Sequence, residues 1–156
     1  MIYSNFRFAI YASLLVLSIT LLSCSNSTSN EEEEQEPIGL RVYSLLESGT
    51  TGNLVVEQLP TGITGEFTIT QEQTFYTVVF VDEELQEFVP DLSEHSIIVT
   101  ASENAQNIDI QRPTITLQNM DFYLQALQGS DAKITITLTH EGASEFVSQP
   151  LPVVIN

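Results

Sequence analysis

Apolar and polar residues alternate along most of the chain after residue 37, which is the period of a β-strand with one buried face. In the clearest example, residues 133–139, Ile134, Ile136 and Leu138 point one way and three Thr residues point the other. The run at 75–81 is apolar on both faces and predicts a central strand. Strands are predicted at 40–46, 54–59, 66–70, 75–81, 97–99, 108–110, 114–117, 133–139 and 146–155.

Turn residues separate these runs, with glycine-containing segments at 49–53, 60–65, 129–131 and 141–143. Many short strands with regular turns are typical of sandwiches and barrels. We therefore predict one all-β domain over 37–156, an immunoglobulin-like antiparallel β-sandwich of seven to nine strands with at most one short helix. An eight-stranded lipocalin-like barrel is the alternative.

The one segment that suggests a helix is 119–129. Met120, Tyr123, Leu124 and Leu127 have helical spacing, between Asn119 as a possible N-cap and a glycine at the other end. The same segment also fits a strand with Phe122, Leu124 and Ala126 facing inward. Of the two interpretations, the sequence favours the helix.

The first 24 residues follow a different pattern. Arg7 is their only charged side chain, and an uncharged, mostly apolar stretch of 14 residues follows at 9–22. This length is typical of the apolar part of a signal peptide and is short for a membrane-spanning helix. The stretch leads directly to Cys24, the single Cys of the chain.

Residues Leu21, Leu22, Ser23 and Cys24 resemble the lipobox of bacterial lipoprotein precursors. The resemblance implies that 1–23 is a signal peptide that is removed and that Cys24 becomes the lipidated N-terminus. Two or more acyl chains hold a protein stably on a bilayer. We therefore expect the protein to attach to a membrane through this lipid anchor. The implied location is the bacterial cell envelope, at the outer membrane. An ordinary signal peptide or an uncleaved anchor helix is the alternative.

Residues 24–36 form the lipidated Cys and a predicted disordered, acidic tether, because Ser, Thr, Asn and Glu leave little to bury. The Glu run at 31–34 is similar to the surface-export signals of Bacteroidota lipoproteins. A solvated spacer is the favoured interpretation, and exposure at the cell surface stays open.

Charge excludes one class of partner. The 156 residues include 21 acidic and 4 basic side chains, for a net charge of −17. Residues 37–156 keep 16 of these acids and 3 of the bases, so the domain itself carries about −13. So few bases cannot neutralise a phosphate backbone, and we expect no nucleic-acid partner.

Candidate catalytic residues are scarce. His95 precedes a predicted strand and His140 ends another, and the two form neither an H-x-H nor an H-x-x-x-H pair. No G-x-S-x-G motif is present. We therefore interpret both as surface or strand-end histidines and expect no zinc site, and we predict no catalytic residues, no cofactor and no enzyme activity.

Acidic side chains gather after the central strand, at Asp82, Glu83, Glu84 and Glu87. Oxygen ligands on a loop suit Ca²⁺, but without an EF-hand spacing we favour a solvated acidic loop, with a cation site as the alternative. Phe88 follows directly and is the one aromatic residue that we single out as a possible partner contact.

These patterns favour a lipid-anchored, non-enzymatic binding or scaffolding module whose partner is an unknown envelope protein or a glycan. The alternatives are a glycan-associated surface lipoprotein of an uptake system and a lipocalin-like carrier of a small ligand.

Overall fold

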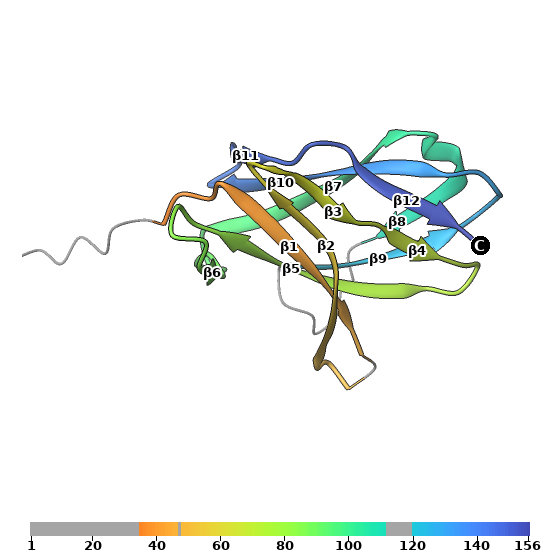
Figure 1. Ribbon diagram of the computed structural model, residues 1–156, viewed down its shortest axis with the longest axis horizontal. Coiled ribbons are helices and arrows are strands. Elements are labelled where there is room, and N and C mark those ends of the chain that lie inside the picture. The colour runs from red at the N-terminus through yellow and green to blue at the C-terminus, as the bar shows by residue number, and fades with distance from the viewer. Residues whose placement is uncertain (1–34, 47, 112–119) are drawn as a thin grey trace, which may run out of the picture. The chain divides into compact units, whose positions relative to one another are not determined.

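Two β-sheets lie face to face in the computed structural model, which describes residues 35–46, 48–111 and 120–156 (Figure 1). These residues belong to one compact unit, Gln35–Asn156. The predicted signal peptide, the lipobox with Cys24, most of the tether and the strand expected at 114–117 lie outside the described residues. Among the described residues, no helix has the length and apolar character needed to cross a membrane.

The larger sheet has the order β3-β2-β1-β5-β9-β8, with β6 paired to the end of β5. Its strands are β1 (Gly39–Leu45), β2 (Thr51–Leu59), β3 (Gly62–Gly65), β5 (Thr74–Val81), β6 (Glu87–Phe88), β8 (Ile108–Gln111) and β9 (Asp121–Ala126). All of its pairings are antiparallel. The β1–β2 hairpin extends well beyond the sandwich (Figure 1).

The smaller sheet is built around its longest pairing, between β7 and β10. Its strands are β4 (Phe67–Ile69), β7 (His95–Glu103), β10 (Ala132–His140), β11 (Ala143–Val147) and β12 (Leu151–Ile155). Strand β4 pairs in parallel with β12, and the other pairings are antiparallel. A single 3₁₀ turn, Ala105–Asn107, carries the chain from β7 to the larger sheet.

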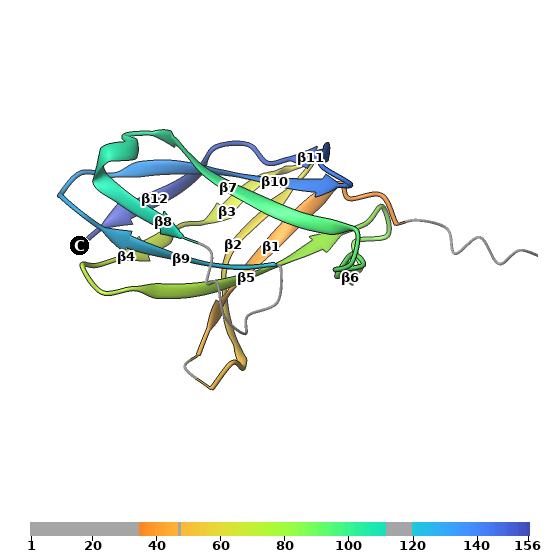
Figure 2. The same cartoon turned by 180° about the vertical axis from the view of Figure 1, so that it is seen from behind.

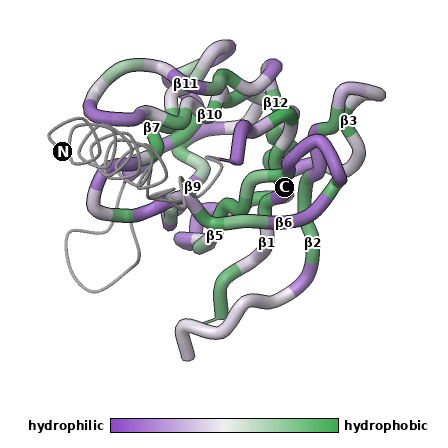
Figure 3. Tube along the Cα trace, turned by 90° about the vertical axis from the view of Figure 1, so that its left-hand side faces the viewer, coloured by the Kyte–Doolittle hydropathy of each residue, from purple (hydrophilic) through white to green (hydrophobic). Residues whose placement is uncertain are grey.

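The apolar core lies between the sheets. Alternate residues of β5 and β10 point into it, and Figure 3 shows hydrophobic segments along both strands. At its centre Phe67, Tyr76 and Phe122 pack edge to face or tilted, with ring centroids 5.0–6.1 Å apart. Such aromatic contacts add to the free energy that burial already contributes. The core is therefore continuous across both layers.

The predicted all-β sandwich is confirmed, and the described residues form two sheets where the barrel alternative needs one closed sheet. The described residues form twelve strands, more than the seven to nine predicted, because several are short and only eight have five or more residues. The β4–β12 pair is parallel, which differs from the wholly antiparallel prediction. The predicted strand at 146–155 is interrupted at 148–150. Pro152 lies in β12 opposite Lys133, before the pairing with β4 begins at Val153, so the amide that proline lacks is not needed there.

The helix prediction for 119–129 is wrong. The described part of this segment forms β9, with Phe122, Leu124 and Ala126 buried, as in the strand alternative. Strand β9 pairs with β5 on one side and β8 on the other, and the Tyr123 ring packs against that of Phe75 at a tilt of 58°. Pairing on both edges outweighs a local spacing that fits a helix, because helix propensity is a weak preference that tertiary context overrides.

Candidate functional site

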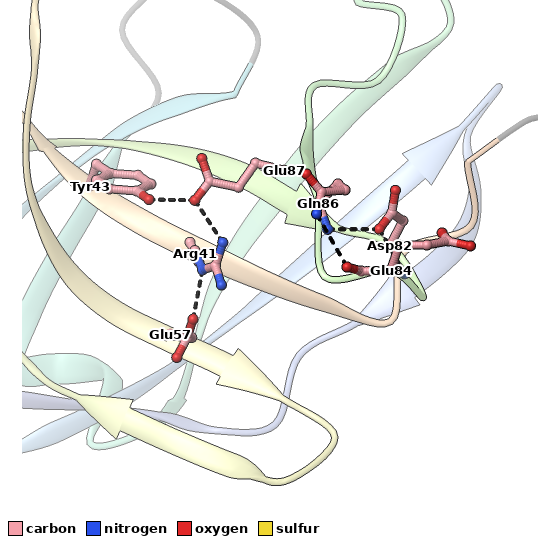
Figure 4. A network of polar contacts seen from close by, with 7 residues as sticks. All are labelled: Arg41, Tyr43, Glu57, Asp82, Glu84, Gln86 and Glu87. Carbon is pink, nitrogen blue, oxygen red and sulfur yellow. Dashed lines mark hydrogen bonds and ion pairs between the residues drawn. The ribbon is translucent and has the colours of Figure 1, made fainter.

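The acidic loop, residues 82–87, connects β5 to β6, and Asp82 holds it together (Figure 4). Asp82 is only 7% exposed. Its Oδ1 accepts hydrogen bonds from the backbone amides of Glu84 at 3.0 Å and Gln86 at 2.8 Å. Its Oδ2 accepts a third from Gln35 Nε2 at 3.2 Å. Asp82 thus serves as a turn-stabilising acceptor.

Glu87 belongs to a second network, on the outer face of β1 (Figure 4). Its Oε1 accepts hydrogen bonds from Arg41 at 2.9 Å and from the Tyr43 hydroxyl at 2.5 Å. The Nε of Arg41 also donates to Glu57 at 2.6 Å. One guanidinium therefore joins carboxylates from two strands.

These contacts shift the titration of the groups that make them. The hydrogen bond from Tyr43, followed by that from Arg41, lowers the pKa of Glu87. Burial, together with the hydrogen bond to Glu87, raises the pKa of Tyr43 to about 12. Both shifts favour the state in which Glu87 is ionised and Tyr43 is protonated.

The sequence-predicted cation ligands are therefore not brought together around one point. Asp82 and Glu87 direct their oxygens at protein donors, whereas Glu83 and Glu84 are exposed. Phe88 is half-buried, packs against the core and has its ring 6.3 Å from that of Phe80. Phe88 therefore lies at the edge of the core, and its role as a partner contact stays a prediction.

The structure instead assembles a cluster that sequence reasoning missed, which we call the histidine cluster: His95, His140 and Glu145. His95 opens β7 and His140 closes β10, and the two residues are directly paired. Their rings stack with centroids 4.4 Å apart. His95 Nε2 lies 3.3 Å from Glu145 Oε2, and His140 Nε2 lies 3.5 Å from Glu94 Oε2.

The expected strand-end positions of both histidines are confirmed, but His95 is 7% exposed and so is not a surface residue. The two histidines are 45 positions apart in sequence, and only the β7–β10 register puts them side by side. The sequence signal for this cluster was a histidine at the start of one strand and another at the end of a second strand. That signal is useful only when it is known that the two strands pair.

The edge of the smaller sheet is a second feature of interest. Within the described part of the chain, β7 pairs along one side only, with β10 (Figure 2). Its nine residues contain neither Pro nor Lys, which commonly block edge strands. Ile98 on β7 and Val147 on β11 both oppose Thr137 and are 48% and 56% exposed. Two exposed apolar side chains thus flank Thr137 on the outer face, and one of them, Ile98, lies on the strand that has an unpaired edge in the described part of the chain.

No protein-family model, no curated protein and no solved structure matches this chain. The described residues define a two-sheet β-sandwich in which β7 pairs on one side only and begins at the histidine cluster.

Proposed function

We propose that the protein is a lipid-anchored component of the bacterial cell envelope whose sandwich domain binds or scaffolds another envelope protein without catalysing a reaction. The anchor part of the proposal rests on the likeness of residues 21–24 to a lipobox. The binding part rests on one observation, the edge of β7, which pairs on one side only in the described chain.

The backbone of β7 favours a partner that adds an extended strand. Ile136 exchanges hydrogen bonds with Ser148 at 2.9 Å, on the side of β10 away from β7. Ile136 therefore makes no backbone hydrogen bond with the residue opposite it on β7, Val99. In such a non-hydrogen-bonded pair the amide of Val99 points away from β10. Neighbouring Ile98 directs its amide toward β10. In strand addition, a partner strand forms hydrogen bonds with outward-pointing amides and carbonyls of this kind. Adjacent apolar side chains such as Ile98 then contribute to selectivity.

The alternatives have less support. A glycan site needs an exposed aromatic surface, and the outward-facing pair of Phe75 and Tyr123, with rings 5.5 Å apart, has Tyr123 only 8% exposed. A small-ligand carrier needs an apolar cavity, whereas the described residues pack into one continuous core between two sheets.

The anchor is tested with Cys24→Ala, and Ser27→Ala serves as the control. In cells given labelled fatty acid, we expect Cys24→Ala to lose the label and to keep residues 1–23, while Ser27→Ala is labelled and processed normally. Normal processing and labelling of Cys24→Ala contradicts the anchor.

The edge is tested in cells with a photo-crosslinking residue at position 98 of the full, anchored chain. We expect a discrete crosslinked species that a second change, Val99→Pro, abolishes, because proline removes an outward amide without taking one from the β7–β10 ladder. Position 54 on β2, where Leu54 is 49% exposed, is the control position. Equal crosslinking from positions 98 and 54, or crosslinks that survive Val99→Pro, contradicts strand addition at β7.

A further inference from the structure

The histidine cluster is assembled by three strands. His95 comes from β7, His140 from β10 and Glu145 from β11. Residues Glu141 and Gly142 form the two-residue turn between β10 and β11, with φ of 49° and 85°, as a type I′ hairpin turn requires. This tight turn returns the chain so that Glu145 lies against His95. The three donor atoms lie within 4.8 Å of one another.

The turn before β7 fixes the orientation of the His95 ring. The backbone amide and hydroxyl of Ser93 both donate to Asp91 Oδ1 at 2.9 Å, which closes the turn. The carbonyl of Asp91 then lies 2.9 Å from the His95 amide and 3.1 Å from His95 Nδ1. Since a carbonyl oxygen only accepts, Nδ1 carries the hydrogen of this contact. In the neutral ring the lone pair is then on Nε2.

That lone pair faces a carboxylate. His95 Nε2 and Glu145 Oε2 are 3.3 Å apart, and two acceptors at this distance repel each other unless a cation lies between them. A proton on Nε2 meets this need, and so does a metal ion. A histidine that donates Nδ1–H to a backbone carbonyl while Nε2 faces other ligands is the arrangement that most metal-binding histidines adopt.

We propose that His95, His140 and Glu145 bind a divalent transition-metal ion of the Zn²⁺ type. Two imidazoles and one carboxylate suit zinc, whereas Ca²⁺ and Mg²⁺ take oxygen ligands almost exclusively. With ligands at about 2.1 Å, donor atoms around a tetrahedral zinc lie roughly 3.4 Å apart. The three donor atoms already lie within 4.8 Å of one another, so metal binding requires only side-chain rotations, for which His140 and Glu145, the two less buried ligands, have room.

The surroundings favour a cation. The domain carries a large excess of acidic residues, which raises the local concentration of divalent cations. A bound ion connects the β10–β11 hairpin to the first residue of β7, so binding also restrains the beginning of the open edge. The metal site does not depend on the proposed partner, because it requires only residues of this chain.

The test is a metal titration of the full chain, purified in detergent without a histidine tag and treated with a chelator. By calorimetry we expect one Zn²⁺ per chain, and no competition from Ca²⁺ or Mg²⁺. Zinc at a hundredfold excess over Kd raises Tm by about 10 °C, since binding to the folded state alone stabilises it.

Glu145→Gln and His140→Gln each weaken zinc binding at least tenfold. The matched control is Glu66→Gln, which removes the same charge at an exposed position outside the histidine cluster and leaves zinc affinity unchanged. Metal-free melting curves establish that each variant is folded. Equal zinc affinity in Glu145→Gln and Glu66→Gln, or displacement of zinc by Ca²⁺, overturns the proposal. Its failure leaves the Cys24 and Val99 experiments unaffected, so the two proposals are tested separately.

Discussion

The acidic loop at 82–87 and the histidine cluster contrast in how their ligand-type side chains are gathered. The loop collects its carboxylates from neighbouring positions, and the protein's own amides, Arg41 and Tyr43 satisfy the two of them that are held in place. The cluster collects its groups from three strands and leaves an imidazole nitrogen facing a carboxylate oxygen. A high density of acidic residues in the sequence is therefore a weak indicator of a cation site. A better indicator is whether hydrogen-bond donors of the protein already occupy the carboxylate oxygens.

The largest expected effect in this comparison is on stability, at Asp82. Asp82→Ala removes the acceptor of two backbone amides and the Gln35 amide at a buried position, and leaving such donors unpaired costs about 2–3 kcal/mol. Glu83→Ala, at an exposed neighbouring position, changes stability by less than about 0.5 kcal/mol. Urea denaturation measures both.

The same experiment distinguishes structural from cation-binding use of the loop. If Asp82 is a turn-stabilising acceptor, added Ca²⁺ leaves the denaturation midpoint of the wild type unchanged. A Ca²⁺-dependent rise that Asp82→Ala abolishes would show that the loop is a cation site after all.

A smaller effect is expected at the turn that positions Glu145. Gly142 has φ of 85° with open space around it, so Gly142→Ala meets no neighbour but strains the backbone by about 1–2 kcal/mol. The control is Gly129→Ala, which also has open space but no positive φ, and is expected to be close to neutral. Because the turn sets the position of β11, Gly142→Ala also weakens zinc binding, as measured in the same titration. Equal stability of the two variants contradicts this account of the turn.

Periodicity was sufficient for most of the fold. The alternation at 133–139 and the doubly apolar run at 75–81 correspond to β10 and β5, since burial on one or both faces leaves a direct imprint on residue choice. It failed at 120–127, where helical and strand spacings coincide and the flanking strands decide. Local signals cannot report pairing between distant strands.

The same limit applies to the candidate sites. His95 and His140 are visible in the sequence as strand-end residues, but their contact depends on the register of β7 against β10. Asp82 is visible as part of an acidic run, but its burial and its three donors depend on how the loop folds back onto Gln35. In both cases the sequence identified side chains able to bind a cation, but it did not identify the residues that contact them.

The smallest expected effect is at Tyr43. It tests whether hydrogen-bond donors of the protein hold the Glu87 carboxylate in place, as the comparison of the acidic loop with the histidine cluster assumes. Tyr43→Phe removes one donor to Glu87 with little change in shape. The Glu87 side chain is 38% exposed, so solvent screens the contact, and we expect a loss of about 0.5–1 kcal/mol at neutral pH. Urea denaturation as a function of pH measures the difference from wild type.

The pH dependence of that loss has a definite sign. Because the hydrogen bond from Tyr43 lowers the pKa of Glu87 in the folded state, its stabilising contribution is complete above the unfolded value of about 4.3. It declines as the pH falls through the lower folded pKa. In a Glu87→Gln background the effect of Tyr43→Phe should fall by more than half, since a neutral amide accepts a weaker hydrogen bond than a carboxylate. A loss that stays the same at low pH and in that background would mean that Tyr43 acts through packing alone, and that Glu87 is less firmly held than its geometry indicates.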